Sequence, residues 1–284
     1  MSILINPQFT PEPKYPVYPP YHTGLYLEDY FHRYALHHGS FAKKYIGVSW
    51  TTVYNDRHNC STLQTWLNSL PRGDQYFTVC QHDDAPRQTL PPNTLVFSAG
   101  GNVMGSNIVP VPLVCSSLGV TQIETNRPVL ASFVGSGTTH PLRSRLVERF
   151  AADKDFIFSA TGWTPRVSSV KLNTFISTTQ RSVFCLAPRG YGKSSFRMYE
   201  AFQLGAIPVY ISDVHYLPWT DELDWSQFAV LIKPEQIPDL KRILLSYSPE
   251  QIAQMQRTAQ QVYHKYFTLE GVCDQIHKRV NATT

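Results

Sequence analysis

The sequence predicts an α/β protein built from two consecutive doubly wound domains, each with a mainly parallel sheet. Short apolar runs typical of strands alternate with helical patterns, and the alternation is interrupted once near the middle of the chain. The length of 284 residues allows one large core or two smaller ones. We therefore expect a first domain over residues 1–122 and a second over 127–266. The last helix, within 267–284, is a candidate to pack back on the first domain.

The first half begins with a proline-rich stretch over residues 1–20, which we expect to be extended. Apolar and aromatic residues at helical intervals predict the helices of this half, and short apolar runs predict its strands. In chain order these are a helix over 25–36, a strand over 45–50, a helix over 63–70, and strands over 76–80 and 94–97. Residues 108–118 contain two prolines two positions apart, which break regular structure, so this stretch is expected to cross between the domains.

The second half shows the same alternation more clearly. Pro141 suits the first turn of a helix, and Gly205 is a good stop after one. The expected strands are 129–134, 156–159, 183–187, 207–211 and 228–232, and the expected helices are 141–150, 168–178, 193–204, 234–245, 249–266 and 269–280. Ligands of such sheets bind where the strands end, beside helix N-termini, so the loops after strands are the candidate site.

Composition excludes several classes of protein. The formal charge is +4 without any Lys/Arg run, so a nucleic-acid partner is not expected. Five widely spaced cysteines without a CxxC pair suggest neither a zinc site nor a disulfide framework. No apolar stretch is long enough for a membrane span. The start of the sequence has no basic region followed by an apolar run. We therefore expect a soluble, cytoplasmic protein.

The stretch from Ala187, APRGYGKS, is one glycine short of a nucleotide-hydrolase phosphate loop. Pro188 and Arg189 suit such a loop poorly, because its successive N–H groups must wrap a phosphate. The later strand-like run FAVLI is followed by Lys233 rather than by an Asp that could hold a metal. A hydrolase of this kind remains the third hypothesis.

The same stretch is better suited to a sugar nucleotide. A helix that opens with Lys193, Ser194 and Ser195 would direct free N–H groups toward an anion, and Arg189 and Lys193 add positive charge. Glu200, under two turns into that helix, could accept hydrogen bonds from ribose hydroxyls; the alternative is a solvated helix position.

Residues 182–213 (SVFCLAPRGYGKSSFRMYEAFQLGAIPVYISD) and 217–230 (LPWTDELDWSQFAV) resemble the exostosin-like glycosyltransferases, glycosyltransferase family 47. The resemblance extends to 127–136 (RPVLASFVGS) and 139–143 (THPLR), and more weakly to 75–84 (QYFTVCQHDD) and 26–31 (YLEDYF). It covers most of the chain, strongly after residue 127. The first residues do not resemble the membrane-anchored N-terminus common in eukaryotic members, so a Golgi location is not expected from them.

The resemblance implies a GT-B fold: two facing Rossmann-like domains with the cleft between them, the donor on the second and the acceptor on the first. It also implies inversion at the anomeric carbon without a required metal; the adjacent Asp83 and Asp84 lack D-x-D spacing, consistent with this. The expected donor is a UDP-sugar, with UDP-xylose as first choice because no surplus basic group is reserved for a uronate carboxylate. The expected acceptor is a hydroxyl of a glycan or glycoprotein oligosaccharide.

An inverting transfer needs positive charge on the departing phosphates and a base on the acceptor side. For the phosphates we select a set of cationic, hydroxyl and small residues: Gly135, Ser136, Arg143, Arg189, Lys193, Ser194 and Ser195. If the family resemblance is set aside, the alternative interpretation of Arg143 is an exposed arginine on the surface of a helix. Asp83 is the first choice of base and Asp84 the second, while His82 could orient either or act itself. A loop Asp that caps the next element is the alternative. A non-catalytic module that binds nucleotide sugars or glycans is the rival function.

Overall fold

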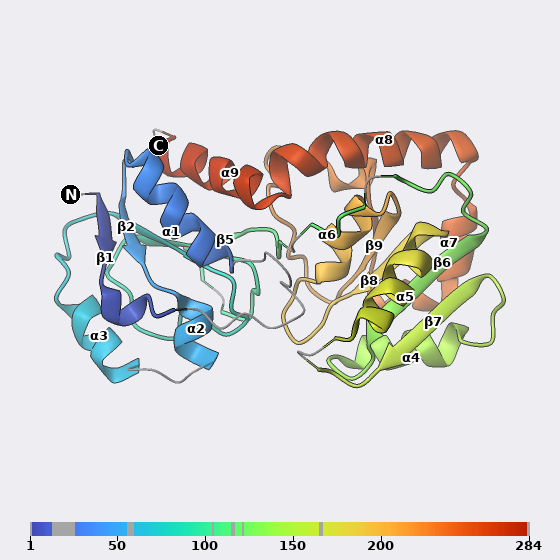
Figure 1. Ribbon diagram of the computed structural model, residues 1–284, viewed down its shortest axis with the longest axis horizontal. Helices are drawn as coiled ribbons and strands as arrows, with labels where there is room; N and C mark the ends of the chain where they lie inside the picture. The colour runs from blue at the N-terminus through green and yellow to red at the C-terminus, as the bar shows by residue number, and fades with distance from the viewer. Residues whose placement is uncertain are drawn as a thin grey trace.

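The computed structural model describes residues 2–12, 26–55, 60–103, 105–114, 117–120, 122–164 and 167–282. They form two α/β domains side by side, each around a five-stranded sheet whose neighbouring strands are parallel (Figure 1). This confirms the predicted fold class, a GT-B arrangement of two Rossmann-like domains. Much of the proline-rich start, residues 13–25, lies outside the described residues.

The N-terminal sheet has the strand order β1-β2-β3-β4-β5. Its elements are β1 (Ile3–Ile5), α1 (Leu27–His38), β2 (Lys44–Gly47), α2 (Trp50–Asn55), α3 (Cys60–Asn68), β3 (Tyr76–Cys80), β4 (Thr94–Ser98) and β5 (Ile108–Pro110). All five residues of β3 are buried, as in a parallel strand covered on both faces. Phe77 packs in one apolar cluster with Phe31 of α1, and its neighbour Tyr76 packs in another with Leu63 of α3. Alternation along β3 therefore covers the two faces with different helices.

The C-terminal sheet has the order β10-β9-β8-β6-β7. Its elements are β6 (Val129–Ser136), α4 (Pro141–Phe150), β7 (Phe156–Thr161), α5 (Ser169–Gln180), β8 (Ser182–Pro188), α6 (Phe196–Gln203), β9 (Ile207–Ile211), β10 (Val230–Ile232), α7 (Leu240–Leu245), α8 (Pro249–Tyr266) and α9 (Leu269–Asn281). The chain leaves β6 toward β7 on one side, and later strands build outward from β8 on the other. The strand order thus reverses between β6 and β8, and a crevice at such a switch point is where doubly wound sheets bind ligands.

Several predicted boundaries are wrong. Trp50 starts α2 instead of ending a strand, and its buried indole donates to Thr78 Oγ1 of β3 at 2.8 Å. Two short edge strands, β1 and β5, were not expected. Pro110 ends β5, where an edge position tolerates a residue without an N–H. The expected helix over 234–245 is divided into a 3-10 segment, Pro234–Asp239, and α7, with Pro238 inside the first part.

The helix expected over 193–204 also starts later than predicted. Ser195 has extended backbone angles and is the N-cap of α6, so Lys193 and Ser194 belong to the preceding loop. The backbone N–H of Lys193 donates to Gly100 O at 2.9 Å, across the boundary between the domains. This donor is therefore engaged by the first domain.

The last helix runs along the N-terminal domain, beside α1 (Figure 1). Tyr34 Oη donates to Asp274 at 2.7 Å, and the N–H of Ala42 donates to Asn281 Oδ1 at 2.7 Å. A single apolar cluster contains Phe77 and Phe97 of the first domain together with Tyr199 and Phe202 of the second. A continuous core of this kind holds the two domains in one arrangement.

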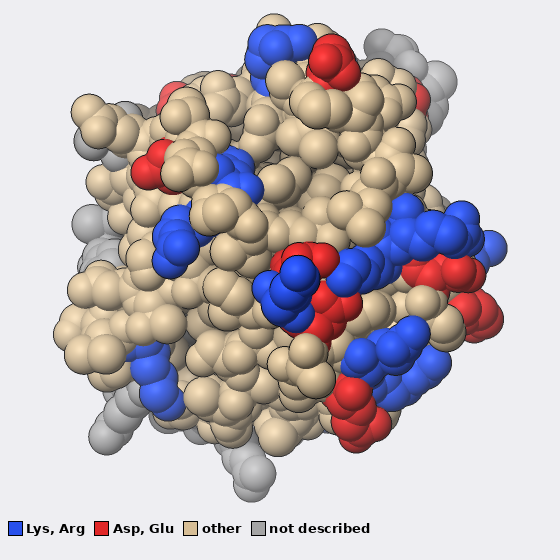
Figure 2. Space-filling model, turned by 90° about the vertical axis from the view of Figure 1, so that its right-hand side faces the viewer, with Lys and Arg blue, Asp and Glu red and all other residues tan. Residues whose placement is uncertain are grey.

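Charged residues of both signs lie side by side on the face at the end of the C-terminal domain (Figure 2). The ion pairs of this domain include Lys241 with Asp153 and Asp155, and Arg242 with Asp239. In the part of the chain that the structure describes, no helix is both long and apolar enough to cross a membrane.

Candidate functional site

Arg143 lies at the switch point of the C-terminal sheet. It belongs to the first turn of α4, and its guanidinium donates to three backbone carbonyls: Ser136 at 2.8 Å, Pro188 at 3.1 Å and Arg189 at 3.1 Å. Ser136 ends β6 and Pro188 ends β8, so one side chain joins the carboxyl ends of both strands. The guanidinium also lies 5.5 Å from the ring centroid of Phe133. Arg143 is thus a fixed cation in the crevice, held by the backbone around it.

The loop after β8 adds two further cations. The side chain of Arg189 is only 11% exposed; it pairs with Asp213 at 2.8 Å and donates to the carbonyl of Tyr191 at 3.1 Å. Burial, with the positive charge of Arg189 nearby, lowers the pKa of Lys193. The Lys193 ammonium lies 6.0 Å from the ring centroid of Tyr216. Three cations from two elements, Arg143 of α4 and Arg189 and Lys193 of the loop after β8, therefore belong to one end of this sheet, an arrangement suited to a diphosphate.

Two hydroxyl groups at this end of the sheet have unused hydrogen-bonding capacity. Thr139 Oγ1 is buried and has no hydrogen-bond partner among the described residues, and the buried Ser194 hydroxyl lies beside the hydroxyl of Tyr199. Thr139 precedes α4, and a Cβ atom placed on Gly190 would lie 3.4 Å from its Oγ1. Buried hydroxyls without partners are costly in a folded protein, so such groups suit a ligand that supplies acceptors. Ser195 is buried as well, at the N-cap of α6.

The first domain contributes Asp83, which lies against this loop. The carboxylate of Asp83 and the carbonyl of Gly100 leave no room for a side chain at position 192, since a Cβ there would collide with Asp83 Oδ1 and lie 2.8 Å from Gly100 O. Gly100 is equally crowded by the Asp83 backbone. Asp83 follows β3 and Gly100 follows β4, so the carboxyl ends of the first sheet meet the phosphate-side loop of the second.

The pKa values of the two neighbouring aspartates are shifted in opposite directions. Burial, reinforced by the charge of Asp84 and opposed by Arg189, raises the pKa of Asp83 to about 6. Burial also acts to raise the pKa of Asp84, but hydrogen bonds from Asn102 and Tyr191 and the charge of Arg87 outweigh it, and the pKa of Asp84 is lowered. Two carboxyl groups whose environments separate their pKa values are typical of an acid–base site, and the raised one suits a base that works near neutral pH. Burial lowers the pKa of His82.

Glu200 is placed differently from the other selected residues. It is fully buried inside α6 and accepts a hydrogen bond and ion pair from Arg197, whose side chain is 13% exposed. Arg197 in turn donates through Nε to Val134 O at 2.7 Å and lies 4.1 Å from the ring centroid of Phe175. The Glu200 carboxylate is therefore fully buried beside Arg197, and Arg197 itself lies against Val134 and Gly135 near the end of β6.

Sequence reasoning missed two tyrosines that join the two halves of the site and an asparagine that holds Asp84 within the first domain. Tyr191 Oη donates to Asp84 Oδ2 at 2.9 Å, Asn102 Nδ2 donates to Asp84 Oδ1 at 3.0 Å, and Tyr216 Oη donates to Ser98 O at 2.6 Å. One signal was available: two adjacent glycines, Gly100 and Gly101, begin three positions after the end of the strand predicted over 94–97. The ring of Tyr216 lies where a Cβ on Gly101 would be, and Gly101 has a φ of +85°, which favours glycine.

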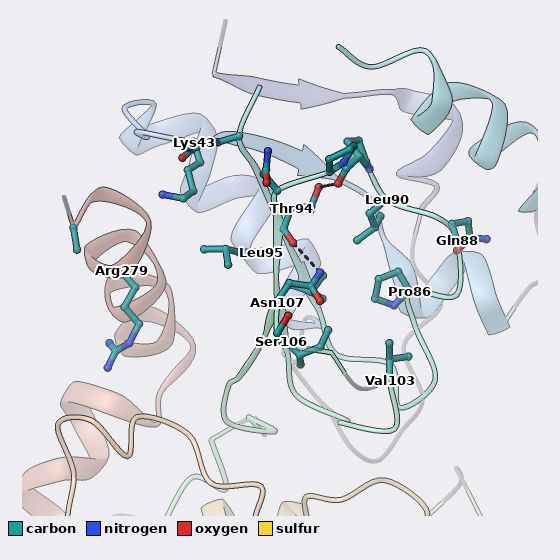
Figure 3. Close-up of a pocket in the computed structure, with 17 residues that line it drawn as sticks. Lys43, Pro86, Gln88, Leu90, Thr94, Leu95, Val103, Ser106, Asn107 and Arg279 are labelled. Atoms are coloured by element: carbon teal, nitrogen blue, oxygen red, sulfur yellow. Dashed lines mark hydrogen bonds between the residues drawn. The ribbon is translucent and has the colours of Figure 1, made fainter. Parts of the chain in front are cut away.

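A separate hollow of about 770 Å³ opens beside β4 and β5 and contains none of the selected residues (Figure 3). Lys43 and Arg279 lie on one side of it and Pro86 and Val103 on the other. Arg279 is already paired with Asp221 at 2.9 Å and Glu222 at 2.8 Å. The hollow lacks the converging cations of the switch point, so it is not the candidate phosphate site. Within the described ranges, no three His, Cys, Asp or Glu side chains are grouped as metal ligands.

Known proteins are similar to part of this chain. A probable glycosyltransferase of Arabidopsis thaliana is 36% identical over 133 residues, which cover 47% of this chain and 24% of that protein. A probable beta-1,4-xylosyltransferase of the same plant is 37% identical over 91 residues, covering 32% of this chain and 22% of that one. A probable glucuronosyltransferase of Oryza sativa subsp. japonica is 40% identical over 84 residues, covering 30% and 20%.

These matches span about a quarter of the length of the relatives or less. The model of the Exostosin GT47 domain matches residues 77–247, a range that contains Asp83, Arg143 and the whole phosphate-side loop. On that match over more than half of its length, the chain belongs to the exostosin GT47 family.

Proposed function

We propose that this protein is an inverting glycosyltransferase that moves a sugar from a UDP-sugar to a hydroxyl of a glycan acceptor. The observation that carries the proposal is Arg143, whose guanidinium joins Ser136 O, Pro188 O and Arg189 O at the switch point of the second sheet. The same crevice faces Asp83 of the first domain across Gly192. A cationic phosphate site opposite a carboxylate of raised pKa is the arrangement that an inverting transfer requires.

In this proposal the leaving diphosphate lies between the loop after β6 and the loop after β8. Arg143 keeps the two strand ends in place, while Arg189 and Lys193 counter the charge that develops on the departing phosphate. Thr139 Oγ1, which has no partner among the described residues, and the buried Ser194 hydroxyl supply further donors. Asp83 accepts the proton of the acceptor hydroxyl as that oxygen attacks the anomeric carbon and the diphosphate leaves.

Xylose is our first choice of transferred sugar, and no metal is required in the proposal. The relatives are named as both a xylosyltransferase and a glucuronosyltransferase, so UDP-glucuronate is the natural competitor. The test is NMR observation of UDP-sugar hydrolysis and transfer over a panel of donors, with and without a chelator. The anomeric configuration of the first-formed product reports inversion or retention.

Three outcomes of this experiment have clear meanings. Transfer that survives the chelator, with an inverted product, supports the proposal. Donor binding without turnover over a wide acceptor panel favours the non-catalytic sugar-nucleotide module. ATP hydrolysis that is lost in Lys193→Ala would instead favour the phosphate-loop hydrolase, although Lys193 lies outside α6 and its N–H is bonded to Gly100.

A further inference from the structure

We infer that Tyr191 is a positioning residue that keeps the phosphate-side loop and the Asp83 carboxylate in register across the domain boundary. The inference rests on the proposed function for its catalytic meaning, but its structural part stands on contacts alone. Three contacts form what we call the loop clamp: Tyr191 Oη with Asp84 Oδ2 at 2.9 Å, Lys193 N with Gly100 O at 2.9 Å, and Gly192 against Asp83.

Tyr191 forms one hydrogen bond with the phosphate-side loop and one with the first domain. Its backbone carbonyl accepts from Arg189 Nη2 at 3.1 Å, on the side of the leaving group. Its hydroxyl donates to Asp84, directly beside the proposed base. No other residue described between the two loops is shown to bond both to a phosphate-side cation and to the 82–84 turn. A shift of this tyrosine would therefore change the distance between base and cation.

Asp84 is the partner through which Tyr191 acts. Its carboxylate also accepts from Asn102 Nδ2 at 3.0 Å and from Arg87 Nη2 at 2.7 Å. The N–H of Asn102 donates to the carbonyl of Asp83 at 3.0 Å, which ties the same turn to the loop after β4. Asp84 is thus saturated with donors, and this is the environment of a fixed ionised carboxylate rather than of a base.

The exposure of Tyr191 argues against a packing role. Its side chain is 60% exposed, unlike the buried tyrosines Tyr199 and Tyr216 nearby. Because the domains already share a continuous apolar core, the hydroxyl of Tyr191 is not needed to hold them together. A local role remains: the bond orders the 189–193 loop where it faces Asp83.

The first test measures the loop clamp without any reaction. Hydrogen exchange of the segment around Lys193 reports whether its N–H stays bonded to Gly100. In Tyr191→Phe we expect this exchange to quicken by about tenfold, as for loss of one bond to a charged group. Tyr34→Phe is the matched control, because it removes another tyrosine–aspartate bond, Tyr34 to Asp274, away from this loop. Unchanged exchange in Tyr191→Phe would overturn the inference.

The second test uses transfer kinetics and pH. Five charged or titratable groups interact electrostatically with Asp83: Asp84, Arg189, Cys80, Tyr191 and Tyr216. His82 and Arg87 act on the neighbouring Asp84, and Lys193 lies beside the ring of Tyr216. Tyr191→Phe should lower kcat by about three- to tenfold with little change in donor KM, as expected for a positioning bond. The pH at which kcat/KM falls on the acid side should also be lower in Tyr191→Phe. A looser loop lets water reach Asp83, and hydration lowers the pKa of that carboxyl group.

Asp84→Asn separates charge from position. Loss of the Asp84 charge by itself also moves the acid-side fall of kcat/KM to lower pH. If Asp84→Asn shows this change in the pH profile and Tyr191→Phe does not, the role of Tyr191 is overturned. If no donor is turned over but exchange still quickens in Tyr191→Phe, the proposed function fails and the loop clamp stands. If transfer is observed and Tyr191→Phe matches the unaltered protein in kcat, pH profile and exchange, the inference fails alone.

Discussion

Asp83 and Gly192 touch across the boundary between the two domains, so closely that the carboxylate occupies the space a side chain at position 192 would need. Asp83 follows β3 of the first sheet, and Gly192 belongs to the loop after β8 of the second. The contact brings the proposed base to the loop that carries Arg189 and Lys193.

Gly192→Ala should separate the two halves of the site. The added methyl group would collide with Asp83 Oδ1 and lie 2.8 Å from Gly100 O, so one loop must move. We expect transfer to fall by about 100-fold, since a displacement of about 1 Å at a reacting centre has that effect. Steady-state kinetics measures the loss. Gly73→Ala is the control, because nothing lies within 4 Å of a Cβ at Gly73; equal activity in both variants would contradict the prediction.

The activity should depend on pH through Asp83. A base must be ionised, and burial raises the pKa of Asp83 to about 6. The value of kcat/KM should therefore fall as pH drops through about 6, whereas an ordinary aspartate would remain ionised to about 4. Asp83→Asn should lose about 10²–10⁴-fold in kcat at pH 7.5, a pH at which the native carboxylate is ionised. A flat profile between pH 5 and 7 would argue for another base.

Asp83→Asn should also change how the free energy of unfolding depends on pH. The folded-state pKa of Asp83 lies above its usual value, so the native state binds the proton more tightly than the unfolded state does. The contribution of Asp83 to stability is therefore full at low pH and is lost as pH rises through about 6. Asp83→Asn should remove this loss and be more stable than the parent at pH 8, by about 3 kcal/mol, with little difference at pH 4. Urea unfolding at the two pH values is the measurement.

Arg143→Ala should weaken both the fold and the donor site. Three carbonyl groups lose their shared donor, which costs about 1–3 kcal/mol of unfolding free energy. Loss of the cation should weaken UDP binding by about 10- to 100-fold. Titration calorimetry with UDP measures the second effect and thermal unfolding the first. Arg143→Lys keeps the charge but not the forked geometry, so it should restore part of the affinity and little of the stability. Unchanged UDP binding in Arg143→Ala would place the donor elsewhere.

Two roles of Glu200 can be distinguished by experiment: binding of the donor ribose, and structural pairing with Arg197. Glu200→Ala leaves the Arg197 guanidinium buried without its carboxylate, so we expect a loss of about 3–5 kcal/mol in unfolding free energy. Glu200→Gln retains an acceptor and should lose less. Parallel urea unfolding and UDP titration distinguish the roles. Donor affinity that falls in Glu200→Gln while stability is kept would support the ribose contact, whereas a loss of stability with normal affinity would exclude it.

Much of the second domain could be predicted because its signals are local. Strand Ile207–Ile211, helix Pro141–Phe150 and helix Pro249–Tyr266 begin and end at the predicted residues, since their proline and apolar boundaries act within one or two turns. The short edge strands Ile3–Ile5 and Ile108–Pro110 could not be found this way. Three residues are too few for a periodic pattern, and pairing with distant strands alone makes them strands.

The sequence by itself determined the alternating α/β pattern, the resemblance to the exostosin family, and the loops after strands as the place to look for a site. Only the tertiary structure decided which groups in those loops face one another. Arg143 joins two strand ends that are 52 positions apart in sequence, Ser136 and Pro188, because the sheet order reverses between them. Glu200 faces inward toward Arg197, and Tyr191 reaches Asp84 in the other domain. Local patterns set backbone conformation over a few residues, but contacts between distant loops depend on how the two sheets pack, which no short stretch encodes.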